Sequence, residues 1–228
     1  ENQDIFAIET VGNRIVAVVC DGMGGAEGGQ IASSLAVETF MKNIRALLRK
    51  DMTMEQLREL ASFCVAQANT AVYQRSLEGE DCRGMGTTLV SAVAGENGTI
   101  VCNVGDSRAY LLRNGGISRI THDHSVVQTL VESGNITAEE ARTHPNRNLI
   151  TRALGTEEIT QCDAFEVSLA HGDKLLLCSD GLSNMMDDQE ILFEVVHGVN
   201  KQLCCQRLLD IAKSRGAPDN VTSILVQV

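Results

Sequence analysis

Two short apolar segments of this chain end in the same dipeptide, aspartate followed by glycine. One segment is residues 15–20 before Asp21-Gly22, and the other is residues 175–179 before Asp180-Gly181. Continuous apolar runs of this length are typical of buried strands. Asp-Gly after a strand is by itself a common turn. If the two buried strands lie side by side, however, Asp21 and Asp180 converge at one end of the sheets.

Strand-like and helical patterns follow one another in groups along the chain. The strand-like runs cover residues 5–10, 15–20, 87–94, 99–104, 108–112, 117–120, 162–167, 174–178 and 221–228. The runs between residues 87 and 120 are separated by Gly, Asn or Asp, which predicts an antiparallel meander.

Helical patterns lie between these groups of strands. They follow the glycine-rich stretch 22–29, recur within 122–154 and return near 202–214. Capping boxes mark further helix starts, at Thr53 with Gln56, Thr137 with Glu140 and Asp187 with Glu190. Because strands come in runs and helices in pairs, the sequence predicts an α+β fold with at least two layers of each kind. We expect residues 1–228 to form one domain, in which the polar, helical segment 122–154 is a subdomain.

Two further aspartates stand at the ends of strand-like runs. Asp106 follows residues 100–105, and Asp219 leads into the last strand. Converging carboxylates repel one another unless protons or cations intervene, and Mg²⁺ and Mn²⁺ prefer carboxylate and carbonyl oxygens. A set of this kind, without nearby Cys or His, points away from zinc. For Asp106, a turn cap or an ion pair with Arg108 is the alternative interpretation.

The acidic balance of the chain limits its partners. With 19 basic and 30 acidic residues, the formal net charge is −11, which disfavours nucleic acid and anionic membranes because both require a basic face. The longest apolar run is far shorter than the roughly 20 residues that span a bilayer. Eight cysteines show no Cys-x-x-Cys spacing, so we expect a reducing cytoplasm and no structural zinc. A monomer is expected.

Other site chemistries have little support in the sequence. The glycine-rich stretch 22–29 joins a strand to a helix, but Glu27 occupies the third glycine position of the dinucleotide fingerprint and no Gly-Lys-Ser/Thr follows. The triplet His122-Asp123-His124 could form part of a metal site, although a polar loop is the simpler interpretation. No Gly-x-Ser-x-Gly motif or cysteine–histidine pair indicates a nucleophilic side chain.

A series of short motifs, spread over essentially the whole chain, resembles the metal-dependent serine/threonine protein phosphatases of the protein phosphatase 2C family. The motifs lie at residues 2–4 (Asn-Gln-Asp), 18–25 (Val-Val-Cys-Asp-Gly-Met-Gly-Gly), 84–88 (Gly-Met-Gly-Thr-Thr), 103–108 (Asn-Val-Gly-Asp-Ser-Arg), 123–125 (Asp-His-Ser), 148–155 (Asn-Leu-Ile-Thr-Arg-Ala-Leu-Gly), 178–181 (Cys-Ser-Asp-Gly) and 219–222 (Asp-Asn-Val-Thr). The Asp-Gly-Met-Gly-Gly form resembles the bacterial housekeeping branch, which opposes Ser/Thr protein kinases.

The resemblance implies a four-layer α-β-β-α sandwich with a binuclear Mn²⁺ or Mg²⁺ centre at one end. The implied activity is hydrolysis of phosphoserine and phosphothreonine in phosphoprotein substrates by a bridging water that the two metals activate. Carried over position by position, Asp21 bridges both metals and the Gly22 carbonyl binds one of them. Asp180 and Asp219 hold the other metal, and Asp106 helps to hold a third, weaker ion.

The resemblance also implies roles for residues around the metals. Asp4 holds a metal-bound water, and Asn220 belongs to the shell that supports the ligands. Residues 122–154 correspond to the mobile flap beside the cleft, and the presence of such a flap favours the housekeeping type.

Two departures from the family pattern bear on mechanism. The family usually has a phosphate-binding Arg three residues before Asn2 and a further strand there, so an N-terminal strand is expected to be missing, which would weaken phosphate binding. Met23 stands where many eukaryotic relatives have a histidine assigned as general acid. Because methionine cannot donate a proton, we consider His144 as the group that assists protonation of the leaving group.

Two alternative functions remain open at this point. A non-catalytic scaffold of the same fold predicts loss of at least one metal carboxylate, yet Asp21, Asp180 and Asp219 are all present. A dedicated phosphatase of a partner-switching circuit would act on a single regulatory phosphoprotein.

Overall fold

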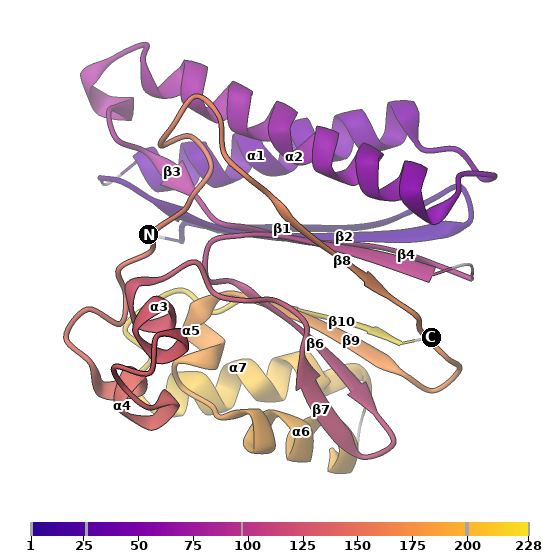
Figure 1. Cartoon of the computed structure of the whole chain (residues 1–228). Coiled ribbons are helices and arrows are strands. Elements are labelled where there is room, and N and C mark those ends of the chain that lie inside the picture. The colour runs from indigo at the N-terminus through magenta and orange to yellow at the C-terminus, as the bar shows by residue number, and fades with distance from the viewer. Residues whose placement is uncertain (1, 26, 97, 199–200, 228) are drawn as a thin grey trace.

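The two apolar runs form strands of two different sheets. The computed structural model describes residues 2–25, 27–96, 98–198 and 201–227. The first run lies in β2 (Arg14–Met23) and the second in β9 (Lys174–Cys178). These strands belong to separate antiparallel sheets that are stacked face to face between helices (Figure 1). The two strands are therefore not neighbours in one sheet, and β2 and β9 instead face each other across the interface between the sheets.

Each sheet is antiparallel and combines strands that are distant in the sequence. The order in the first sheet is β1 (Asp4–Val11), β2, β4 (Leu89–Gly95), β5 (Gly98–Val104) and β8 (Asp163–Val167), with the short β3 (Gly86–Thr87) paired to β2. The order in the second sheet is β10 (Ser223–Gln227), β9, β6 (Arg108–Arg113) and β7 (Gly116–Arg119). The predicted meander is wrong, because the β4–β5 and β6–β7 hairpins lie in different sheets and the chain crosses between them at residues 105–107.

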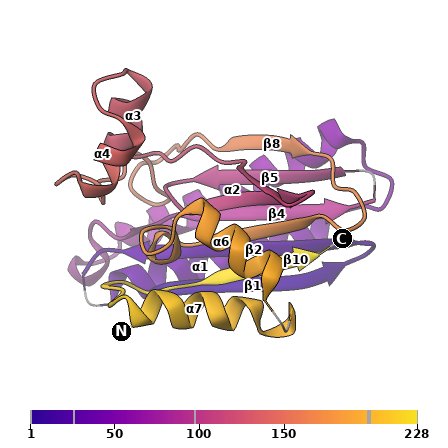
Figure 2. The same cartoon turned by 90° about the horizontal axis from the view of Figure 1, so that it is seen from below.

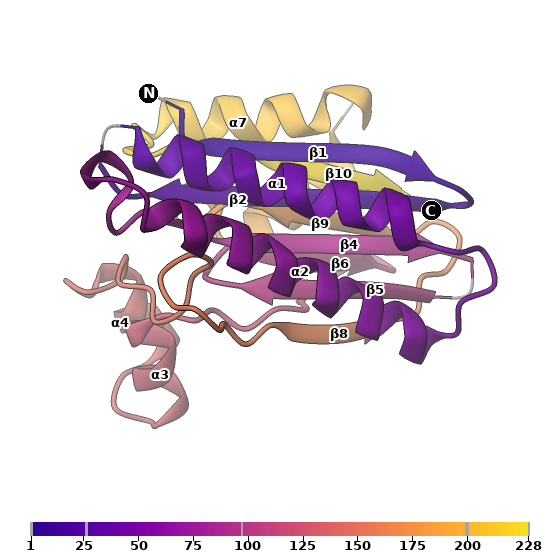
Figure 3. The same cartoon turned by 90° about the horizontal axis from the view of Figure 1, so that it is seen from above.

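Successive side chains of a strand point to opposite faces of its sheet, so strands with continuous apolar runs bury both faces. On β2, Val16 and Val18 pack against helices, whereas Ala17 and Val19 pack against the second sheet. The helices α1 (Gly28–Leu47) and α2 (Met54–Ser76) lie across the outer face of the first sheet (Figure 3). The second sheet is covered by α5 (Asp180–Ser183), α6 (Asp188–His197) and α7 (Cys204–Ser214). The prediction of a four-layer α+β sandwich is confirmed.

The three predicted capping boxes form at the starts of α2, α4 (Ala138–Thr143) and α6. In each box the cap side chain accepts a hydrogen bond from the backbone N–H three residues later, at 3.2 Å for Thr53, 3.2 Å for Thr137 and 2.8 Å for Asp187. Each cap satisfies a backbone donor that the helix itself leaves free.

Segment 122–154 contains less helix than expected. Its helices are α4 and α3 (Val126–Glu132), and neither has a buried residue. Figure 2 shows both helices projecting from the sandwich. The ends of the segment are held by isolated bridges, which pair Ser125 with Ile150 and Thr87 with Leu154. The segment is thus attached at its base and exposed along its length.

The eight cysteines are free thiols, and most of them are buried. Among the described residues, no helix combines the length and the apolar character needed to cross a membrane.

Candidate active site

The register of the first sheet places Asp4 and Asp21 together between the two sheets. Asp21 lies on the same face of β2 as Ala17 and Val19, and β1 pairs Asp4 directly with Asp21. Asp4 is only 4% exposed. Its Oδ2 accepts a hydrogen bond from the hydroxyl of Ser179 at 2.7 Å. Because Ser179 directly follows β9, this contact joins the ends of the two sheets.

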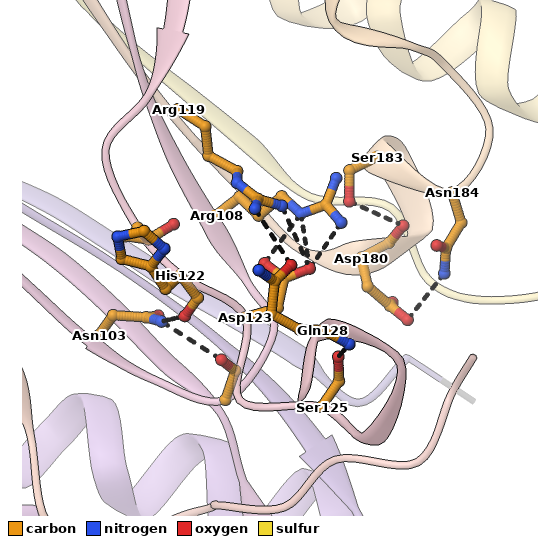
Figure 4. Close-up of polar contacts among 12 residues, drawn as sticks. Asn103, Arg108, Arg119, His122, Asp123, Ser125, Gln128, Asp180, Ser183 and Asn184 are labelled. Carbon is orange, nitrogen blue, oxygen red and sulfur yellow. Dashed lines mark hydrogen bonds and ion pairs between the residues drawn. The ribbon is translucent and has the colours of Figure 1, made fainter. Parts of the chain in front are cut away.

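The other two predicted ligands come from the C-terminal third of the chain. Asp180 is the first residue of α5, and its Oδ2 accepts a hydrogen bond from Asn184 at 3.0 Å (Figure 4). Asp219 is exposed and lies between α7 and β10. Next to it, Asn220 Oδ1 accepts the backbone N–H of Gln3 at 2.7 Å. Asn220 therefore anchors the N-terminal segment beside these carboxylates.

Burial and mutual repulsion perturb the whole carboxylate group. Burial, followed by the charges of neighbouring aspartates, raises the pKa of Asp21 to about 10; these neighbours are Asp4, Asp180, Asp219 and Asp106. Burial is also the main cause that raises the pKa of Asp4 and that of Asp180. The predicted site residues are thus close enough to interact, and they cannot all be ionised without a compensating positive charge.

The donor set fits hard divalent cations. Asp4 Oδ1 and Asp180 Oδ1 are buried and have no hydrogen-bond partner in the part of the chain that the structure describes. Buried acceptors of this kind require a donor or a cation. No three His, Cys, Asp or Glu side chains among the described residues are grouped closely enough to hold a metal on their own. Each ion would therefore also need carbonyl and solvent oxygens, as Mg²⁺ and Mn²⁺ usually do.

The glycines of the two Asp-Gly dipeptides are required by close backbone approach. A Cβ on Gly22 would lie 2.0 Å from the carbonyl oxygen of Gly29, and one on Gly181 would lie 1.9 Å from that of Asn220. The Gly22 N–H also donates to the Gln3 carbonyl at 3.1 Å. These dipeptides mark places where segments distant in sequence cross beside the carboxylates, rather than simple turns.

Asp106 lies between β5 and β6, and Arg108 does not donate a hydrogen bond to its carboxylate. Arg108 donates to Asp123, with Nη2 2.6 Å from Oδ2, and Arg119 Nη1 lies 3.5 Å from the same oxygen (Figure 4). The alternative ion pair between Asp106 and Arg108 therefore does not form as a hydrogen-bonded contact. Burial, then the charges of Asp180 and Asp123, raises the pKa of Asp106 to about 7. Since Asp123 is engaged by two arginines, the triplet His122-Asp123-His124 does not form a metal site.

Sequence reasoning missed a polar network that joins the base of segment 122–154 to the loop before Asp106. His124 Nδ1 accepts the N–H of Gly105 at 3.0 Å, so in the neutral ring Nε2 carries the proton and faces Asp163 Oδ2 at 3.1 Å. Arg152 donates to Asp163 Oδ1 at 2.9 Å. Burial lowers the pKa of His124. No local pattern could have paired these residues, because Asp163 lies 39 positions after His124.

His144 and Met23 lie on different elements. His144 follows α4, where its Nδ1 accepts the backbone N–H of Asn146 at 3.1 Å. Nε2 therefore carries the proton when the ring is neutral. Met23 ends β2 and pairs with Gly86 of β3.

The metal-free protein is expected to lose stability as the pH rises from about 5 to about 9. Asp21 and Asp106 keep their protons in the folded state up to pKa values of about 10 and about 7, whereas the unfolded chain loses them near 3.8. Because the unfolded state then binds fewer protons, the free energy of unfolding falls with pH over this window. Thermal denaturation in EDTA across this range checks the slope. Asp21→Asn should flatten it, and a rising melting temperature would contradict the account.

Comparison with known proteins identifies the family. The protein phosphatase 2C family profile matches residues 1–210. The serine/threonine phosphatase stp of Listeria monocytogenes serotype 4b (strain F2365) is 36% identical over 233 residues, which cover 100% of this chain and 89% of that protein. The structure of serine/threonine phosphatase Stp1 from Staphylococcus aureus matches with a TM-score of 0.94 and 36% identity, covering 100% of this chain and 89% of that one. The catalytic domain of the phosphatase PstP, in complex with two manganese ions, matches with a TM-score of 0.82 and 34% identity, covering 99% and 90%.

The chain, with its two facing sheets and the carboxylates between them, thus belongs to the protein phosphatase 2C family. It is a serine/threonine protein phosphatase, similar to the bacterial members of that family. The resemblance inferred from the motifs is confirmed.

Proposed function

We propose that this phosphatase hydrolyses phosphoserine and phosphothreonine with two Mn²⁺ or Mg²⁺ ions held between the ends of its sheets. Asp21 would bind both ions, the Gly22 carbonyl one of them, and Asp180 and Asp219 the other. The observation that carries the proposal is the raised pKa of Asp21 among four neighbouring aspartates, beside buried carboxylate oxygens without donors. The manganese ions in the PstP complex support the same metal.

The chain's own residues supply binding and orientation. When bound, a pair of such ions lowers the pKa of a water molecule, aligns it with phosphorus and neutralises charge on the phosphoryl oxygens. Asp4 is held rigidly by Ser179 through Oδ2, which leaves Oδ1 available to accept a hydrogen bond from the attacking water. Asn220 fixes the backbone at Gln3, one residue before Asp4. A further weak ion is assigned to Asp106, whose carboxylate no arginine engages by a hydrogen bond.

A phosphothreonine peptide tests the activity directly. Release of inorganic phosphate should require Mn²⁺ or Mg²⁺, because without a cation the aspartates offer no positive charge to neutralise the phosphoryl oxygens. The assay compares wild type with added Mn²⁺, wild type in excess EDTA, and Asp180→Ala with Mn²⁺. Full turnover in EDTA would rule out the metal mechanism.

His144 is proposed to assist protonation of the leaving group, since Met23 cannot. His144→Ala should slow release from a phosphothreonine peptide, whose alkoxide is a poor leaving group, more than release from an aryl phosphate with a good one. Steady-state turnover on both substrates decides this. An equal effect on the two substrates would remove His144 from the chemistry.

Segment 122–154 is proposed to act as a flap that selects phosphoproteins. Its helices have no buried residues, and isolated bridges hold its base, features typical of weakly anchored units that move. Exchange of this segment with that of a relative should change the preference among protein substrates while small aryl phosphates are still cleaved. If both activities fell together, the segment would instead be part of the catalytic scaffold.

The resemblance to housekeeping phosphatases supports a role against a Ser/Thr protein kinase in the cytoplasm, with the enzyme acting as a monomer. The partner-switching alternative predicts one dominant substrate. Comparing turnover on several unrelated phosphothreonine peptides distinguishes the two roles, because a housekeeping enzyme should accept most of them at similar rates.

A further inference from the structure

A buried hydroxyl at the junction of β3 and β4 contacts the segments that carry Asp21 and Asp106. Thr88 is 4% exposed and lies between two pairings of β2, one that ends at Thr87 of β3 and one that begins at Val90 of β4. Its N–H donates to the Asp21 carbonyl at 2.8 Å. In return the Asp21 N–H donates to Thr88 Oγ1, at 3.0 Å, and not to a backbone carbonyl. The side chain of Thr88 thus replaces one acceptor of the sheet ladder.

The same hydroxyl reaches the loop that leads from β5 into the second sheet. Thr88 Oγ1 lies 2.7 Å from the hydroxyl of Ser107, which is fully buried, and one of the two hydroxyls donates to the other. On the other side of Asp106, Gly105 has a φ of +103°, and a Cβ there would lie 2.6 Å from the methyl carbon of Thr88. Thr88 therefore contacts both neighbours of Asp106, one through its hydroxyl and the other through its methyl group.

We propose that Thr88 is a positioning residue that sets the spacing and orientation of Asp21 relative to Asp106. The inference rests on the proposed function, because it assumes that both carboxylates bind the catalytic cations. Thr88 does so through the backbone of Asp21 on one side and through the Ser107 hydroxyl and Gly105 on the other, and it does not itself bind an ion or the substrate. It couples the main pair of ions, held through Asp21, to the weaker ion assigned to Asp106.

Loss of the hydroxyl should disturb both aspartates at once. The Asp21 N–H and the Ser107 hydroxyl would each lose a buried partner, and a buried polar group without a partner is unfavourable enough to shift the backbone. Catalysis is sensitive to such shifts, since a displacement of about 1 Å can lower a rate on the order of 100-fold. The effect should appear in turnover and ion binding more than in substrate binding.

The test compares Thr88→Val, which keeps the shape and loses the hydroxyl, with Thr88→Ser, which keeps the hydroxyl. With saturating Mn²⁺, kcat on a phosphothreonine peptide should fall about 10- to 100-fold for Thr88→Val, with KM changed less than about 3-fold. Thr88→Ser should stay within about 3-fold of wild type. Thr99→Val is the matched control: Thr99 is fully buried on β5, and in the described part of the chain its hydroxyl has no hydrogen-bond partner. It should behave as wild type.

Two measurements do not depend on activity. In the metal-free protein, hydrogen exchange of the Asp21 amide should be faster in Thr88→Val than in wild type, Thr88→Ser and Thr99→Val. Calorimetric titration with Mn²⁺ should show weaker binding for Thr88→Val alone. If Thr88→Val does not fold, Ser107→Ala removes only the link to the second sheet, and it should raise the Mn²⁺ concentration for half-maximal turnover while the Asp21 amide stays protected.

Several outcomes would overturn the proposal. Wild-type kcat, Mn²⁺ binding and amide exchange in Thr88→Val would show that the hydroxyl does not position Asp21. Equal impairment of Thr88→Ser and Thr88→Val would assign the effect to packing of the methyl group, and an unchanged Mn²⁺ requirement in Ser107→Ala would remove the link to Asp106. If wild type released no phosphate from the peptide, the proposed function would fail, whereas the amide exchange would still test Thr88.

Discussion

Replacing Asp180 with alanine is expected to lower Mn²⁺-dependent phosphate release on the order of 1,000-fold, the upper range for removing one electrostatic stabiliser. The variant should nevertheless fold. Asp180 raises the pKa of Asp21 and has a buried oxygen without a partner, so its removal relieves repulsion in the metal-free protein. Asp219→Ala should act in the same way, because Asp219 also raises the pKa of Asp21. Turnover and thermal denaturation in EDTA measure the two effects separately.

Asp210→Ala provides a control of equal charge change. Asp210 is exposed on α7 and accepts a hydrogen bond from Gln206 of the same helix, so its loss should leave turnover unchanged. A metal-free Asp180→Ala protein that melts below wild type would contradict the account of carboxylate repulsion.

Replacing Asp106 with alanine should lower turnover by about 10- to 1,000-fold while two ions still bind tightly. Asp106 lies in the loop between β5 and β6, and the contacts of its neighbours Gly105 and Ser107 with Thr88 do not involve its carboxylate. A single carboxylate with mostly water as companions holds only a weak, exchangeable cation. The ion would therefore matter in the transition state and not for folding.

Calorimetric titration with Mn²⁺, run beside steady-state kinetics, checks the role of Asp106. The expected result is two retained tight sites with reduced turnover. Either unchanged turnover or loss of the tight pair would refute the assignment of a weak third ion.

Local sequence patterns predicted the elements but not how they pair. The capping boxes depend on residues three positions apart, and all three formed as expected. The apolar runs at β2 and β9 were likewise recognisable as buried strands. Which sheet each strand joins depends on contacts between distant segments, and so the predicted meander was wrong.

For the candidate site, too, local patterns identified residues but not the long-range contacts that position them. Asp21, Asp180, Asp106 and Asp219 could be found because each stands at an end of a strand-like run, and motif resemblance supplied Asp4. The contacts that hold them in place could not be found, since Ser179 is bonded to Asp4 at a separation of 175 residues, and Thr88 to Asp21 at a separation of 67. No periodicity of a helix or strand reports such pairs.

The division of the site between the two ends of the chain has a consequence for biosynthesis. Asp4 and Asp21 leave the ribosome well before Asp180 and Asp219, and Asn220 must reach back to Gln3. During translation the first sheet can begin to form with its helices, but the carboxylates stay apart until the final strand pairs with β9. A nascent chain is therefore expected to be inactive until the segment that carries Asp219 and β10 has been synthesised and has folded onto β9.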